Sequence, residues 1–191
     1  MSSALPAAIA MLSSADAGER AAAARDIYRA GRAVADEASR AWREDPEIAA
    51  LLRVDGSNDP QCNVGLAVSP ATFEAIRGAN GSPNLADVPP DQDAREFELH
   101  FDGMIVLDIL TSREPDGQGA IARYLSKFGE GIQQVEYRCR DVEAAAAILQ
   151  QKFNVAPVYP KARPGADGTR INFFLARTEK GEKVLIELYE K

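Results

Sequence analysis

The sequence predicts an α+β fold in which paired βαβββ units form a curved mixed sheet, preceded by an α-helical N-terminal extension. The first 55 residues are rich in alanine and carry no strand pattern. After residue 60, the order strand, helix and then up to three strands occurs twice. Units of about 45–60 residues are too long for a solenoid repeat, so they indicate a duplication within one domain.

The domain organisation follows from this pattern. We expect a helical extension over residues 1–58 and one domain over 61–191. Within that domain the halves cover about 61–112 and 132–191, and a linker helix covers 117–128.

The N-terminal extension carries helix signals. Ile27, Val34, Ala38 and Trp42 recur at helical spacing. Asp45 precedes Pro46 and an apolar run, which predicts an N-cap and a new helix. The run 56–60 is typical of a loop, so we expect the extension to be separable from the domain.

The first half begins with a predicted strand over 63–68, followed by a helix that Ser69 caps. A long loop or irregular edge strand covers 79–94. Asp102-Gly103 lies between two strand-like runs, which predicts a hairpin. Gly129 ends the linker helix and Asp141 caps the helix of the second half. The strands predicted for the second half are 134–139, 155–159, 170–176 and 184–189.

Composition and net charge narrow the range of possible partners and functions. Hydrophobic residues make up 46% of the chain, the net charge is −7 and the pI is near 4.9. An acidic surface argues against nucleic acid or an anionic membrane as the partner, so a small molecule is expected, with a homodimer possible. Cys62 and Cys139 have no metal or redox spacing and are interpreted as buried thiols. The apolar run near the N-terminus lacks a charged start, which favours a cytoplasmic protein.

Several segments carry a family resemblance. The run GEGIQQV at 129–135 is followed by RDVEAA at 140–145, and RPGADG at 163–168 and VLIEL at 184–188 come later. The first two segments resemble a G-x-G-I-H-H-[IV] run and a D-[IV]-x-A-A helix start in methylmalonyl-CoA epimerases. These belong to the vicinal-oxygen-chelate superfamily, with glyoxalases, bleomycin-resistance proteins and extradiol dioxygenases. The resemblance is good over 105–190, weak over 61–104 and absent over 1–60, and it implies a glyoxalase-like fold.

The resemblance also implies a site. The family binds one divalent metal through two side chains of each half, and the metal stabilises an enolate-like intermediate. The first histidine falls at Asn63 and the second at Gln134. The remaining two ligands fall at Asp108 and Glu187.

Both histidine positions therefore differ from the family pattern. The only histidine, His100, lies away from these positions and is expected to cap or to face solvent. Asn63, Asp108, Gln134 and Glu187 offer no nitrogen donor of the imidazole kind, so we expect no cofactor. The alternative is one divalent ion, Mg²⁺, Mn²⁺ or Ca²⁺, held by these four residues.

Strand alternation extends the expected pocket. Gln134, Glu136 and Arg138 share one face of their strand, where Glu136 beside Arg138 is either an ion pair or a substrate clamp. The candidate acid–base residues are Glu187 and, in the stretch where the epimerases place a second carboxylate, Asp87 or Asp91.

Three functions remain open at this point. The first is a degenerate glyoxalase-like pocket protein without metal that binds a small molecule or serves assembly. The second is an isomerase or lyase that acts on an acyl-CoA or related carboxylic substrate with a divalent metal, as the resemblance implies. The third is an interaction module whose cup is filled by its own side chains.

Overall fold

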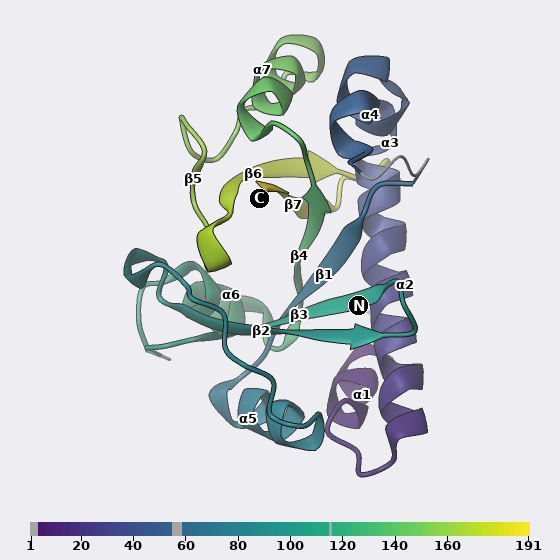
Figure 1. Ribbon diagram of the computed structural model, residues 1–191, viewed down its shortest axis with the longest axis vertical. Coiled ribbons are helices and arrows are strands. Elements are labelled where there is room, and N and C mark those ends of the chain that lie inside the picture. The colour runs from purple at the N-terminus through teal and green to yellow at the C-terminus, as the bar shows by residue number, and fades with distance from the viewer. Residues whose placement is uncertain (1–3, 55–58, 115) are drawn as a thin grey trace. The chain divides into compact units, whose positions relative to one another are not determined.

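The computed structural model describes residues 4–54, 59–114 and 116–191, and it divides into two compact units (Figure 1). The first unit combines the helices up to Gly31 with Asn63–Gln133. The second combines Arg32–Cys62 with Gln134–Lys191. Each half of the duplication is thus grouped with part of the N-terminal helices. Within the described ranges, no helix has the length and apolar character needed to cross a membrane.

The first unit holds a three-stranded sheet in the order β2-β3-β1. β1 runs parallel to β3, and β2 runs antiparallel to β3. Its elements are α1 (Ala4–Met11), most of α2 (Ala17–Ala38), β1 (Cys62–Ala67), α5 (Pro70–Ala79), η1 (Pro90–Gln92), β2 (Ala94–Phe101), β3 (Ile105–Ser112) and α6 (Ala120–Phe128).

The second unit repeats this pattern in the order β4-β7-β6-β5. β4 runs parallel to β7, and β6 runs antiparallel to β7. Its elements are α3 (Arg40–Glu44), α4 (Pro46–Leu52), β4 (Gly131–Arg138), α7 (Val142–Phe153), β5 (Arg163–Pro164), η2 (Ala166–Gly168), β6 (Arg170–Arg177) and β7 (Lys183–Glu190). The strands of both units pair in the same order and with the same parallel and antiparallel directions, which confirms the α+β class and the internal duplication.

The helix and turn signals of the sequence are confirmed. Asp45, Ser69 and Asp141 each accept hydrogen bonds from backbone N–H groups of the helix they precede. Asp102 and Gly103 both have positive φ, 40° and 70°, and with Met104 they form the three-residue loop between the paired residues Phe101 and Ile105.

The strand predicted over 155–159 is wrong. Its backbone pairs with β6 through an isolated bridge between Pro157 and Phe174 and a hydrogen bond from the Val158 N–H to the Phe173 carbonyl, 2.8 Å, and this does not make a strand. Pro157 and Pro160 have no N–H to donate, so a continuous ladder cannot form. The two-residue strand β5 pairs with β6 instead.

The corresponding segment of the first half, over 79–94, contains no strand up to Asp93. It lies beside β2 through a hydrogen bond from the Ala86 N–H to the Glu96 carbonyl, 3.0 Å. Of the predicted loop 56–60, residues 56–58 lie outside the described residues.

The N-terminal helices supply core side chains to both units. In the first unit Ile9, Leu12 and Ile27 are fully buried. In the second, the Trp42 ring meets the Phe174 ring edge to face at 6.4 Å. Figure 1 shows α4 next to α7, and Lys152 of α7 donates to Asp45 and Glu47 at the start of α4. These contacts make the helices part of each hydrophobic core.

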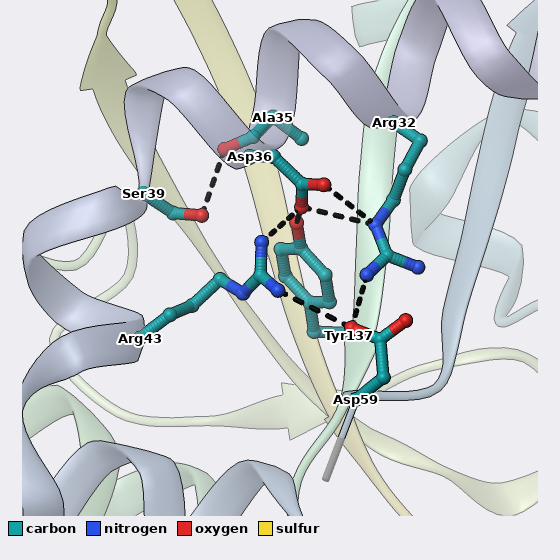
Figure 2. Close-up of polar contacts among 7 residues, drawn as sticks. All are labelled: Arg32, Ala35, Asp36, Ser39, Arg43, Asp59 and Tyr137. Carbon is teal, nitrogen blue, oxygen red and sulfur yellow. Dashed lines mark hydrogen bonds and ion pairs between the residues drawn. The ribbon is translucent and has the colours of Figure 1, made fainter.

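A charged network joins the end of α2 to β4 within the second unit (Figure 2). The Asp36 carboxylate accepts hydrogen bonds from Arg32 Nε at 3.0 Å, from Arg43 and from the Tyr137 hydroxyl at 3.2 Å. Asp59 accepts from Arg32 and Arg43 as well. Burial raises the pKa of Tyr137 well above its usual value, so its hydroxyl remains a donor to Asp36 at neutral pH.

The two cysteines are buried and unbridged, as the sequence predicts. Burial raises the pKa of Cys62 to about 12 and that of Cys139 to about 11. Both thiols are therefore protonated at neutral pH, and neither has the thiolate character of a reactive cysteine.

Gly31 provides a test of the packing of α2 on β1. A Cβ atom at Gly31 would lie 2.7 Å from Cγ1 of the buried Val64, whereas a Cβ at Gly78 in α5 would meet nothing within 4 Å. We predict that Gly31→Ala lowers the free energy of unfolding by about 1–3 kcal/mol. Gly78→Ala, the matched control, should raise it by about 0.5–1 kcal/mol. Urea unfolding measures both, and equal effects would contradict the close approach of α2 to β1.

Candidate functional site

The first unit places Asn63 and Asp108 on one face of its sheet. Asp108 of β3 pairs with Gly65 of β1, and Asn63 lies two residues before Gly65 on the same face. Both polar side chains are buried, with exposed fractions of 3% and 6%. Val64 points to the opposite face, where Gly31 of α2 approaches it.

The second unit repeats this arrangement with one difference. Glu187 of β7 pairs with Glu136 of β4, and Gln134 lies two residues before Glu136 on the same face. All three are buried, with exposed fractions of 6–8%. Glu136 and Glu187 are called the acid pair below.

Each unit therefore positions an amide and an acid by the same register. Asn63 corresponds to Gln134, and Asp108 corresponds to Glu187. The position of Gly65 in the first unit is taken by Glu136 in the second, so the second unit carries one additional buried carboxylate.

Gln134 bridges the acid pair. Its Nε2 donates to Glu136 Oε1 at 3.0 Å and to Glu187 Oε2 at 2.8 Å. The two N–H groups of a glutamine amide are thus both engaged by carboxylates. The bridging donor is a neutral amide.

Aromatic side chains of Phe173 and Tyr159 lie on the side of the acid pair that faces β6. Phe173 of β6 is the register partner of Glu187 and is half-buried. The Tyr159 ring meets Phe173 edge to face at 6.1 Å, and the Arg163 guanidinium lies 4.7 Å from the Tyr159 ring centroid. Phe173 lies in the strand predicted over 170–176, although the sequence analysis did not assign it to the site. Tyr159 lies outside any strand and is held by two hydrogen bonds with Asn172, so periodicity gave no signal for it.

The remaining predicted residues lie in more exposed surroundings. Arg138 is half-buried and its guanidinium donates to the Gln61 side chain at 3.5 Å. Asp87 and Asp91 are exposed residues of the segment before β2. His100 faces solvent beside Glu98, with Nε2 and Oε2 3.0 Å apart, as expected.

The second unit also has an open hollow of about 350 Å³ that none of these predicted residues lines. It is lined by Ala38, Trp42, Asn154, Val155, Ala156, Leu175, Ala176 and Arg177.

Solved structures identify the family. A methylmalonyl-CoA epimerase from Mycobacterium tuberculosis is 32% identical to the chain, which spans 85% of that protein with 67% of its own length, at a TM-score of 0.54. The chain belongs to the methylmalonyl-CoA epimerase family of the vicinal-oxygen-chelate superfamily. The glyoxalase-like fold that the sequence predicts is thereby confirmed.

Other solved structures are similar to the chain as well. A methylmalonyl-CoA epimerase in complex with methylmalonyl-CoA and NH₄⁺ is 28% identical, with 68% of this chain and 92% of that one covered and a TM-score of 0.53. A Bacillus halodurans hypothetical protein is 24% identical over 68% of this chain and 91% of its own, with a TM-score of 0.55, and shares the fold. No protein-family model matches the sequence, and no curated protein does.

The metal implied by the epimerase family does not fit the second unit as arranged. A transition metal favours imidazole nitrogen, and Gln134 stands where the family pattern has histidine. The place within 3.0 Å of both acids, where a shared cation would have to lie, is taken by the Gln134 amide nitrogen. In the part of the chain that the structure describes, no group of three or more His, Cys, Asp or Glu side chains is arranged to hold a metal.

A pair of variants tests the role of Gln134. Gln134→Leu leaves the acid pair without its bridging donor, so we predict a loss of about 2–4 kcal/mol in the free energy of unfolding. The matched control is Gln133→Leu, because the buried Gln133 Oε1 has no hydrogen-bond partner. That variant should change stability by less than about 1 kcal/mol. Denaturant unfolding compares them, and a harmless Gln134→Leu would contradict the bridge.

Proposed function

We propose that this member of the methylmalonyl-CoA epimerase family is a metal-independent pocket protein that binds a small molecule and lacks epimerase activity. The observation that carries the proposal is the Gln134 amide, whose nitrogen donates to both Glu136 and Glu187. In this arrangement an amide replaces the metal–imidazole pair of the family pattern. The acids are therefore held by a permanent protein donor.

Loss of the metal removes the Lewis acid that the family pattern supplies to an enolate-like intermediate. A buried amide cannot replace it, because its two N–H groups are already bonded to carboxylates. Binding requires only a shaped polar floor, which the buried amide, the acid pair and Phe173 provide.

A second candidate function is an isomerase or lyase acting on an acyl-CoA. The retained Glu187, buried at 8% exposure, favours it, because the family has a glutamate at this position. This function requires the Gln134 amide to turn away, so that Mg²⁺, Mn²⁺ or Ca²⁺ takes the place of its nitrogen.

Metal content and turnover separate the two candidates. We predict that the purified protein contains no stoichiometric Zn, Co or Ni and does not epimerise methylmalonyl-CoA, with or without added Mg²⁺, Mn²⁺ or Co²⁺. The variant Gln134→His restores an imidazole beside Glu136 and Glu187 in the second unit and should bind Co²⁺ more tightly than the wild-type chain does. Elemental analysis and a coupled epimerase assay measure these outcomes.

A bound metal together with turnover would contradict the proposal of a metal-independent pocket protein. One tightly bound metal per wild-type chain, together with turnover that Glu187→Gln abolishes, would establish the second candidate function. Retention of that metal in Glu187→Gln would place it elsewhere in the chain.

A further inference from the structure

We propose that the open hollow of the second unit is a binding site for small organic carboxylates, which Arg177 and the Trp42 indole recognise. The hollow has a volume of about 350 Å³, which is sufficient for a small molecule. Neither Gln134 nor the acid pair lines it, so this site is separate from the pocket of the proposed function.

Three segments of the second unit form the hollow. Ala38 and Trp42 come from the end of α2 and from α3, residues 154–156 follow α7, and residues 175–177 end β6. The bridge between Pro157 and Phe174 is isolated, so 154–156 and 175–177 do not continue it as paired strands. Proline has no N–H for a ladder, and the end of β6 is therefore left as an open edge beside the hollow.

Arg177 is the only ionisable residue that lines the hollow. In the part of the chain that the structure describes, its guanidinium has no acidic partner and meets only the Gly181 carbonyl, at 3.5 Å. Lys183, the register partner of Arg177 on β7, likewise has no acidic partner among the described residues. Like charges at paired positions repel each other, so an anion bound there would relieve the repulsion.

The charges around Arg177 favour an anion as well. The turn between β6 and β7 is bonded to α2 and α3, because Glu179 accepts from Arg40 at 2.9 Å and its N–H donates to Glu37 at 3.0 Å. Four cations and three acids gather in this region, and their sum is +1, whereas the whole chain carries −7: Arg40, Arg177, Lys180 and Lys183 against Glu37, Glu179 and Glu182. A local positive charge on an acidic protein directs small anions to this place.

Trp42 supplies a ring surface and a hydrogen-bond donor. It is 6% exposed, packs against Phe174 and lines the hollow. Among the described residues its indole N–H has no acceptor, and this nitrogen is not one of the fully enclosed atoms that lack a partner. A largely buried indole N–H normally has an acceptor, and an oxygen of a ligand in the hollow would provide it.

A carboxylate with an apolar body fits these groups. The planar guanidinium fork matches the two oxygens of a carboxylate, and the indole N–H adds a third donor. Val155 and Leu175 line the same hollow with aliphatic side chains, and Leu175 is 44% exposed. Contact with the body of a ligand would remove this apolar surface from water.

Three probes of matched shape test the proposal: sodium cyclohexanecarboxylate, cyclohexanecarboxamide and cyclohexylmethylammonium chloride, at constant ionic strength. Trp42 is the only tryptophan, so the full chain has one indole N–H signal in ¹⁵N-edited NMR spectra. We expect the carboxylate to shift this signal downfield in a saturable manner and to bind at least about tenfold more tightly than the carboxamide. The ammonium compound should not bind, because Arg177 repels it.

Three variants locate the binding. Arg177→Gln should weaken carboxylate binding by at least about tenfold. Arg29→Gln, the matched control, removes the same charge from an exposed position on α2 in the first unit and should leave binding unchanged. Ala156→Leu keeps Arg177 but fills part of the hollow, so it should also weaken binding.

The opposite results are distinct. Equal affinity for carboxylate and carboxamide, unchanged affinity in Arg177→Gln, or an indole signal that none of the probes shifts would each overturn the carboxylate site. None of these outcomes affects the proposed function, because the acid pair and Gln134 do not line the hollow.

Discussion

Two buried carboxylates lie side by side on the parallel strands β4 and β7, and one neutral amide bridges them. Glu136 and Glu187 are register partners, and Gln134 Nε2 lies 3.0 Å and 2.8 Å from their oxygens. This constraint governs the chemistry of the second unit, because buried acids require hydrogen-bond donors, and the donor here is part of the chain. At this point the second unit differs from the family pattern, which has a histidine at the position of Gln134.

The face of each sheet opposite these buried polar side chains shows how the cost of their burial is offset. There Val64 meets Gly31 of α2, and Tyr137 donates to Asp36 of the same helix. Trp42 extends this apolar layer over Phe174. The N-terminal helices therefore add buried apolar area to both units, which offsets the cost of the buried acids. These contacts give the helices a role in the core of each unit.

Much of this arrangement was accessible from the sequence, because it depends on local signals and alternation. The caps at Asp45, Ser69 and Asp141 predicted the helices, and alternation placed Gln134 beside Glu136 on one face. Periodicity does not report hydrogen-bond partners, so the bridge from Gln134 to Glu187, 53 residues away, was not predicted. The strand expected over 155–159 was wrong because Pro157, and Pro160 just after it, have no N–H to donate to a ladder. Tyr159 therefore lies outside any strand, where alternation does not indicate the direction of a side chain.

The side-chain amide of Gln134 reports on the central claim directly. In ¹⁵N-edited NMR spectra, assigned by the loss of one NH₂ pair in Gln134→Leu, the account predicts two well-separated proton signals that exchange slowly with water. Both signals should remain unshifted and unbroadened when Mg²⁺ or Mn²⁺ is added, because the amide nitrogen stays between the two acids. An NH₂ pair with the shifts of a solvent-exposed glutamine, or one that Mn²⁺ broadens at stoichiometric concentration, would contradict the bridge and place a metal where the amide is proposed to act.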